Sequence, residues 1–415
     1  MKERAILHSD ANCFYASCEM VLQPELRGKA VAVCGNTEER HGIVLAKSER
    51  AKQAGIKTGM PNWEALQKCP DLVIVPPRFE YYAEFSKLLH GIYERYTDYI
   101  ESFGLDECWL DVTDNIKSPM EIAEEIRQAV KDELGLTVSI GVSFNKVFAK
   151  LGSDLKKPDA ITEISKDNFK SLVWPLPCSE LLYCGRQTTL QLEKMAVHTI
   201  GQLATLPLEY VERKFGKNGH SLWVFANGLD DSPVAHMNDY EMPKSIGHGV
   251  TCVENLETYE EANKVIVSLC QDIGYKLRKG RLCAGGVALT VKDKNLVSQT
   301  YQARLNVSTQ DELTISHLAY ELLLKNYSFR EKIRALTVTA INITEEDTPV
   351  QSIMLFDYGA QEKRSRLNSA LDALKNEFGK DVIKPAVILD EHKMPKKRQV
   401  DTVLPGMMKK KGPTH

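Results

Sequence analysis

Residues 98–112, DYIESFGLDECWLDV, carry the pattern that decides the fold. Apolar runs on both sides of Gly104–Glu107 predict two β-strands, 98–103 and 107–112, that form a hairpin. Asp106 and Glu107 lie in its turn. A short strand near the N-terminus, AILHSD at 5–10, ends on Asp10. The sequence therefore places carboxylates at the ends of separate apolar strands.

The elements around the hairpin complete a recognisable order. Helices are predicted over 80–97 and 118–134, a strand over 137–144, and a Lys-rich helix that ends near 156. Residues 1–13 with 78–165 then read β, followed by α-β-β-α-β, which is typical of a split ferredoxin-like sheet with helices on one face. The stretch 14–77, with strands predicted at 31–35 and 42–46, is an insertion in this order.

The rest of the chain divides further. We expect residues 166–230 to be mainly helical, and 231–243, DSPVAHMNDYEMP, to be a linker because it has few apolar residues and two prolines. Residues 244–345 alternate strand and helix patterns and predict a second α+β domain. The segment 346–415 is a C-terminal tail in which a helix is predicted over 361–378. The fold class is therefore α+β multidomain.

Composition narrows the class of protein. Of the 415 residues, 43% are hydrophobic and 26% charged, which is ordinary for a globular protein. Apolar runs are too short for a membrane helix or a signal peptide, so we expect a cytoplasmic protein whose ten cysteines are reduced. Residues 1–243 hold 27 basic and 35 acidic residues, whereas residues 244–344 hold 13 and 10. This asymmetry favours metal chemistry in the first part and polyanion contact in the second.

The acidic residues at the strand ends are the candidate catalytic group. In a ferredoxin-like sheet the first and third strands are neighbours, so Asp10 is expected beside Asp106 and Glu107. Three adjacent carboxylates repel one another unless cations neutralise them, and Mg²⁺ prefers such oxygen ligands. Two such ions about 3.5–4 Å apart suit phosphoryl or nucleotidyl transfer. The alternative is that Asp10 caps a strand and that Asp106 and Glu107 are ordinary turn residues.

Aromatic and basic residues occur near these acids. Phe14 and Tyr15 follow Asp10, and a bulky ring beside a bound sugar would exclude a ribonucleotide at its 2′ position; the alternative is a core role, which we favour for the ring of Phe14. Basic residues that could hold a triphosphate lie in KSERAKQAG and FNKVFAKLGSDLKKPDA. On their own, such basic stretches are more often solvated helix faces than ligands.

The ordered motifs together resemble the Y-family, or translesion, DNA polymerases of the bacterial polymerase IV and UmuC group. They are SDANCFYASCE (9–19), PELRGKAVAV (24–33), GIKTGMP (55–61), ESFGLDECWLDVT (101–113), SIGVSFNKVFAKLGSDLKKPDA (139–160) and KSIGHGVT (244–251). The resemblance covers about residues 5–345. It implies a right-hand polymerase with a ferredoxin-like palm (1–13 and 78–165), small fingers (14–77), a helical thumb (166–230) and an α+β little finger (244–345).

The resemblance also implies roles for individual residues. Asp10, Asp106 and Glu107 become the catalytic metal ligands for two Mg²⁺ ions, and Tyr15 becomes the steric gate. Lys157 is expected on the incoming triphosphate, with Lys52 and Phe14 as further contacts. The implied reaction is template-directed DNA synthesis from dNTPs on primer–template DNA, by a monomer.

The chain departs from the family pattern at four places. Gly104-Leu105 stands where many relatives have Ser-Ile, and Asn12 replaces the second acid of Asp-x-Asp, as in UmuC-like members. Glu49 and Lys52 stand where many relatives have a Tyr-x-x-Arg pair, which leaves the triphosphate contacts of the fingers open. The thumb of the family contains a helix-hairpin-helix motif that binds DNA phosphates through backbone amides and normally has two glycines. This chain keeps only Gly185 of the two.

Two further segments are candidate contact sites. A basic stretch is expected on DNA phosphates, or else on solvent at a helix end; it comprises Lys276, Arg278, Lys279, Arg281, Lys292 and Lys294. Residues Gln351–Phe356, QSIMLF, resemble the peptide that binds the sliding clamp, the β subunit of DNA polymerase III, with Gln351, Met354 and Phe356 as its anchors. The alternative is a strand that packs on the helix at 361–378.

Other functions remain compatible with the pattern. One is a nucleotidyl cyclase of the GGDEF type on the same palm, which the separate basic domain and Tyr15 count against. Another is a catalytically inactive accessory factor that binds DNA and the clamp, which the presence of all three carboxylates counts against.

Overall fold

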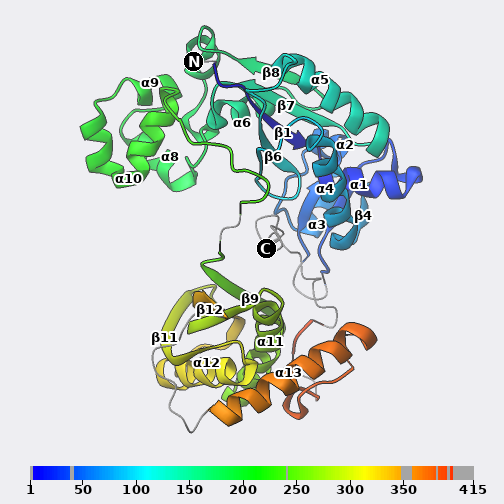
Figure 1. Cartoon of the computed structure of the whole chain (residues 1–415), viewed down its shortest axis with the longest axis vertical. Coiled ribbons are helices and arrows are strands. Elements are labelled where there is room, and N and C mark those ends of the chain that lie inside the picture. Colours follow the sequence, from blue (N-terminus) through cyan, green and yellow to red (C-terminus); the bar gives the residue numbers. More distant parts are fainter. Residues whose placement is uncertain are drawn as a thin grey trace. The chain divides into compact units, whose positions relative to one another are not determined.

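A computed structural model describes residues 3–37, 42–239, 242–346, 358–379, 382–389 and 393–395. These residues form two compact units, one built mainly from the chain up to residue 239 and one from residue 242 onward (Figure 1). Across the described ranges, no helix has the length and apolar character that a bilayer crossing requires. All ten cysteines are free thiols, as expected, and eight of them are buried.

A five-stranded sheet with the order β5-β6-β1-β7-β8 organises the first unit. β1 lies in its middle, pairs antiparallel with both β6 and β7, and is buried along its whole length. Asp10 therefore stands opposite Glu107, and the expected pairing of the first strand with the hairpin is confirmed. The strands are β1 (Ile6–Ala11), β5 (Ile100–Ser102), β6 (Glu107–Asp111), β7 (Val138–Ser143) and β8 (Ile161–Ile164).

Helices cover both faces of this sheet. The helices are α4 (Phe79–Tyr93), α5 (Pro119–Ala129), which continues as a π-turn (Val130–Leu134), and α6 (Lys146–Leu155). Leu7 packs in the core that α4 and α5 share, whereas Ile6 packs with Ala149 of α6. The two helices of the predicted β-α-β-β-α-β order, α4 and α5, thus share one face, and α6, which follows that order, covers the other. α6 lies so close to β7 that a Cβ on Gly141 would be 1.8 Å from the Ala149 carbonyl oxygen.

Residues 14–77 form a small layer of their own. Its three-stranded sheet has the order β3-β2-β4, in which β2 is antiparallel to β3 and parallel to β4. Ser48 caps the helix that follows β3 by accepting a bond from the Ala51 amide. The elements are α1 (Phe14–Leu22), β2 (Val31–Cys34), β3 (Val44–Lys47), α2 (Glu49–Gln53), α3 (Asn62–Lys68) and β4 (Val73–Val75).

The next segment is helical, as predicted, and shares its core with α6 through Phe148 and Leu151. The longest of its helices is kinked at Gly216, whose φ of 60° and ψ of −142° are not helical. The helices are α7 (Phe169–Val173), α8 (Arg186–Lys194), α9 (Ile200–Ala204) and α10 (Leu208–Ala226).

The predicted linker is held against the five-stranded sheet over its described part. Val234 is 3% exposed, the Ala235 amide donates to Glu101 (2.9 Å), and the Met237 amide donates to the Asp98 carbonyl (2.8 Å). Burial of Val234 and the two backbone bonds that follow it hold this otherwise polar segment in place. The predicted linker therefore packs against the first unit over residues 231–239.

The second unit is an antiparallel sheet with the order β11-β10-β12-β9. α11 and α12 cover one face and supply its core. On the other face the exposed glycines 247 and 249 of β9 lie beside Thr339 and Thr337. The elements are β9 (Ser245–Leu256), α11 (Tyr259–Lys279), β10 (Leu282–Asp293), β11 (Ser298–Thr309), α12 (Glu312–Asn326) and β12 (Ile333–Glu345).

A C-terminal helix, α13 (Tyr358–Phe378), lies against α11 of the same unit (Figure 1). Arg278 of α11 joins them, because its guanidinium bonds Asp372 of α13 (2.6 Å) and Glu312 of α12 (2.6 Å) and its side chain is only 11% exposed. Arg278 is therefore an internal anchor, and its assignment to DNA phosphates is corrected. The sequence pattern missed this because its partner lies 94 residues away.

Candidate active site

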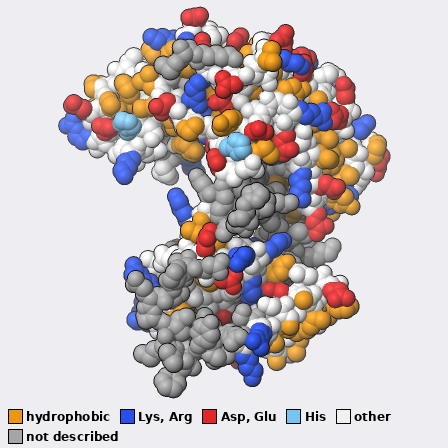
Figure 2. Space-filling model, viewed as in Figure 1, with side chains coloured by type: hydrophobic (Ala, Val, Ile, Leu, Met, Phe, Trp, Pro, Cys, Tyr) orange, Lys and Arg blue, Asp and Glu red, His pale blue; other side chains and the backbone are white. Residues whose placement is uncertain are grey.

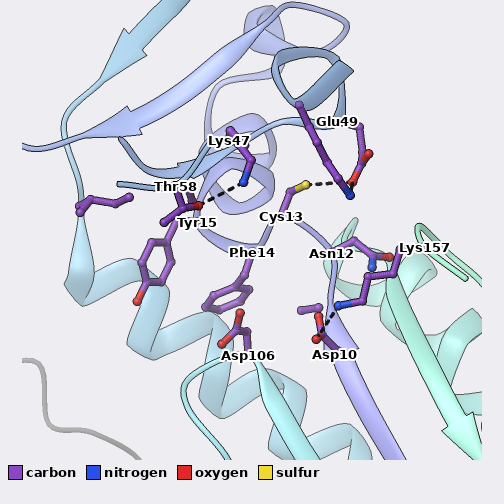
Figure 3. A pocket seen from close by; sticks show the side chains of 14 residues that line it. Asp10, Asn12, Cys13, Phe14, Tyr15, Lys47, Glu49, Thr58, Asp106 and Lys157 are labelled. Carbon is purple, nitrogen blue, oxygen red and sulfur yellow. Dashed lines mark hydrogen bonds and ion pairs between the residues drawn. The ribbon is translucent and has the colours of Figure 1, made fainter. Parts of the chain in front are cut away.

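A cavity of about 370 Å³ opens where the five-stranded sheet meets the small layer formed by residues 14–77 (Figure 3). Asp10 and Asp106 lie on one side of it, and Lys47 and Glu49 on another (Figure 3). The lining residues are Asp10, Ala11, Asn12, Cys13, Phe14, Tyr15, Leu45, Ala46, Lys47, Glu49, Lys52, Thr58, Asp106 and Lys157. Five of the sequence-predicted site residues besides Asp10 are among them: Phe14, Tyr15, Lys52, Asp106 and Lys157.

The hairpin turn is fixed against the end of β1. The Ala11 amide donates to the Asp106 carbonyl (3.0 Å), and Gly104 has a φ of 111°, which favours glycine. Asp10 is 7% exposed at the end of its strand. Burial, together with the negative charges of Asp10 and Glu107, raises the pKa of Asp106 to about 6. The two aspartates share the cavity, and burial and repulsion there disfavour the charged form of Asp106.

Asn12 closes the loop after β1. Its side-chain amide donates to Ser139 Oγ (2.9 Å), and its side-chain oxygen accepts from Thr137 Oγ1 (3.1 Å) and from the Asp159 amide (2.9 Å). These bonds tie β1, β7 and the segment after α6 together. The replacement of the second family acid by Asn12 therefore provides a neutral structural bridge at this position.

Lysines hold two of the three predicted metal ligands. Lys157 Nζ lies 2.7 Å from Asp10 Oδ2, and Lys150 Nζ pairs with Glu107 Oε2. Burial raises the pKa of Glu107, but contacts with His8 and Lys150 outweigh it and bring the pKa to about 2. Glu107 is not part of the cavity lining. In the described ranges, no three His, Cys, Asp or Glu side chains form a ready ligand set for a metal.

Tyr15 stands on a rigid aromatic platform. Its ring stacks on Tyr82 with centroids 4.4 Å apart and planes 12° apart, and it contacts the edge of Phe79 at 5.9 Å. Tyr82 is itself fixed by donating to Glu19 (2.6 Å), which also pairs with Arg78. The ring of Phe14 is 3% exposed and belongs to the core, as favoured from the sequence.

The wall formed by the small layer carries mixed charge. Lys47 Nζ donates to Thr58 (3.1 Å), and Lys52 Nζ lies 3.7 Å from Glu49 Oε1. Cys13, whose φ is 51°, donates its thiol to the same Glu49 oxygen (3.2 Å). Glu49 thus places a negative charge on this wall, with Lys47 and Lys52 near it.

The remaining predicted contacts are not among the residues that line this cavity. Gly185 is the N-cap of α8, and Lys276 and Lys279 lie in the last turn of α11. Arg281 is exposed, Lys292 belongs to β10, and Lys294 pairs with Glu331 (2.9 Å). The clamp peptide with Gln351, Met354 and Phe356 lies outside the described residues.

Three residues at the site were not predicted for the role that the structure shows. His8 is fully buried on β1, with Nε2 3.4 Å from Glu107 Oε2, and Lys150 and Asp154 of α6 lie beside the acids. The alternation of β1 was an available signal, since residues 6, 8 and 10 share one face of the sheet.

Comparisons with known proteins agree with this geometry. The model of the impB/mucB/samB family matches residues 9–154, and the model of its C-terminal domain matches residues 243–354. The chain is 46% identical over 393 residues to DNA polymerase IV of Acetivibrio thermocellus, covering 94% of this chain and 98% of that protein. It is 33% identical to DNA polymerase IV 1 of Bacillus subtilis, covering 94% of each.

A solved structure shows the same fold. The Y-family DNA polymerase chimera Dbh-Dpo4(243-245)-Dbh matches with a TM-score of 0.73 at 23% identity, over 82% of this chain and 99% of that one. The predicted fold class, a right-hand α+β polymerase with palm, fingers, thumb and little finger, is thereby confirmed. The chain belongs to the impB/mucB/samB family and is a Y-family DNA polymerase of the polymerase IV group.

Proposed function

We propose that this polymerase performs template-directed translesion synthesis, adding nucleotides from dNTPs to a primer 3′-hydroxyl and releasing pyrophosphate. One observation carries the proposal: Asp10 and Asp106 share a cavity with Tyr15, Lys52 and Lys157. Relatives named DNA polymerase IV support it. The proposal includes low fidelity, a role in DNA repair and damage-induced mutagenesis, and action as a cytoplasmic monomer.

The acidic cluster fits divalent cations. Among the residues that the structure describes, the four carboxylates of Asp10, Asp106, Glu107 and Asp154 lie near two lysines, Lys150 and Lys157. We infer that Asp10, Asp106 and Glu107 hold two Mg²⁺ ions, since hard cations prefer carboxylate oxygens. When bound, such ions lower the pKa of the attacking hydroxyl and neutralise the leaving pyrophosphate.

The other residues of the cavity bind and orient the nucleotide. Lys52 of α2, Lys157 after α6 and Phe14 at the N-terminus of α1 all line the cavity, and we assign them to the incoming triphosphate. Tyr15 faces the same space, supported by Tyr82, and acts as the steric gate against the ribose 2′-hydroxyl. The catalytic contribution of these residues is positioning and charge stabilisation.

We assign the palm to 1–13 and 78–165, the fingers to 14–77, the thumb to 166–230 and the little finger to 244–345. The N-terminus of α8 at Gly185 offers backbone amides to a DNA phosphate. In the little finger, phosphate contacts fall to Lys276, Lys279, Arg281, Lys292 and Lys294. Such contacts position the duplex without reading its sequence and weaken as salt rises.

We further propose that Gln351–Phe356 binds the sliding clamp, with Gln351 bonding to main chain and Met354 and Phe356 filling apolar pockets. Deleting these six residues should remove the stimulation of synthesis by the clamp and leave synthesis without the clamp unchanged. Primer extension with and without loaded clamp measures both. An equal loss in both reactions would contradict a tethering role.

Primer extension tests the proposed function itself. The full chain with Mg²⁺, a primer–template and the four dNTPs should extend the primer, including past a template lesion that stops a replicative polymerase. Failure to extend any primer would reject the proposal and favour the alternative of a catalytically inactive accessory factor.

A further inference from the structure

We propose that Lys150 is a placeholder for a metal ion: it holds Glu107 when no cation is bound and passes to Asp154 when one binds. Lys150 is thus a positioning residue that acts through Glu107. The proposal rests on the assignment of Glu107 as a metal ligand made above. Neither the family resemblance nor the comparisons assign Lys150 or Asp154 a role.

The surroundings of Lys150 support the first half of this proposal. Its side chain is 15% exposed, its Nζ pairs with Glu107 and lies 5.2 Å from the centre of the Phe103 ring, and His8 lies behind the same Glu107 oxygen. A lysine buried to this extent needs a carboxylate partner. Since Glu107 is turned toward Lys150 and does not line the cavity, a cation that uses Glu107 has to compete with the ammonium group.

Asp154 is the alternative partner that Lys150 needs when a cation binds Glu107. It lies one turn after Lys150 on α6, 39% exposed, with Oδ2 3.9 Å from Lys150 Nζ and Oδ1 2.8 Å from Lys157 Nζ. Each lysine therefore contacts one catalytic acid and Asp154 at once. When a cation binds Glu107 or Asp10, the lysine that is released still has Asp154 as its partner.

The two halves predict changes of opposite sign. Lys150→Met removes the positive charge that competes with the cation for Glu107, so Mn²⁺ should bind about tenfold more tightly. In a partly buried site, repulsion between two adjacent positive charges exceeds about 1.4 kcal/mol, which corresponds to this factor. Asp154→Asn removes the alternative partner, so both lysines should hold the catalytic acids more firmly and Mn²⁺ should bind several-fold more weakly. A purely structural role would weaken binding in both variants.

The chain offers a matched control. Lys146 lies one turn before Lys150 on α6 and forms a similar buried pair with Glu101 (2.7 Å, side chain 13% exposed), but Glu101 is not one of the proposed metal ligands. Lys146→Met should leave Mn²⁺ affinity unchanged. If it shifts the affinity as much as Lys150→Met does, the effect is a general consequence of losing a buried lysine, and the proposal is overturned.

Mn²⁺ binding to the full chain, without DNA or nucleotide, is measured from the electron paramagnetic resonance signal of the free Mn²⁺. Thermal unfolding in Mg²⁺ is a second readout. On adding Mg²⁺, the melting temperature of Lys150→Met should also rise more than that of the wild type. Unchanged or weaker Mn²⁺ binding by Lys150→Met, or no binding by any variant, overturns the proposal.

Two outcomes separate the placeholder role of Lys150 from the proposed polymerase reaction. A wild-type chain that extends primers, with no shift in Mn²⁺ affinity in Lys150→Met, leaves the polymerase intact and rejects the placeholder. Opposite shifts in the two variants of a chain that extends no primer would support the placeholder and reject the proposed reaction.

Discussion

Asp106→Asn is expected to lower the rate of primer extension by about 10³-fold or more while leaving the fold intact. The substitution removes one charge from the cavity that Asp106 shares with Asp10. The loss of one ligand to a catalytic cation costs several kcal/mol of transition-state stabilisation, and about 4 kcal/mol corresponds to this factor. Single-turnover extension with saturating dNTP measures the chemical step.

Stability should move in the other direction. The negative charges of Asp10 and Glu107 disfavour ionised Asp106, so a neutral isostere relieves repulsion, and the metal-free variant should unfold at the same temperature as the wild type or slightly higher. Asp114→Asn, an exposed acid beyond the end of β6, is the control and should change neither quantity. Full extension by Asp106→Asn would reject the assignment of this residue.

Tyr15→Ala is expected to admit ribonucleotides, with a loss of about 10²-fold in the selection of dNTP over rNTP. The gate is effective only if the ring cannot move away, and the stack on Tyr82, fixed in turn by Glu19 and Arg78, prevents that movement. An overlap between the ring and a 2′-hydroxyl costs about 3 kcal/mol, which gives this factor. The measurement is kcat/KM for matched dNTP and rNTP on one template.

Tyr15→Phe separates the ring from its hydroxyl. Because the selection is steric, phenylalanine should retain it, whereas alanine should lose it mostly through a faster rate with rNTP. Unchanged sugar selection in Tyr15→Ala would remove the gate from this residue and direct the search to other groups that line the cavity.

Local patterns gave most of the architecture. The helix predicted at 118–134 is Pro119–Ala129 with its continuation Val130–Leu134, and the strand predicted at 137–144 is Val138–Ser143. These elements have a strong period and clear boundaries, so their sequence alone defines them. The convergence of Asp10 and Asp106 also followed from sequence, because a ferredoxin-like order makes the first and third strands neighbours.

Pairings across elements could not be predicted. The Lys150–Glu107 and Arg278–Asp372 pairs join residues 43 and 94 positions apart, and each depends on how a helix packs against its neighbours. Sequence counted Arg278 as one more charge in a basic stretch, although burial gives it an internal partner. The packing of residues 231–239 was missed for the same reason, since the one residue that decides it, Val234, carries no periodic signal.

The docking of α13 has a mechanical consequence for the segment before it. Residues 347–357 join two elements of the same unit, because β12 ends at Glu345 and α13 is anchored through Asp372. Eleven residues span at most about 36 Å when extended, so the midpoint of this segment reaches about 18 Å from its ends. A clamp bound to Gln351–Phe356, as proposed above, would therefore be tethered to the second unit through both β12 and α13.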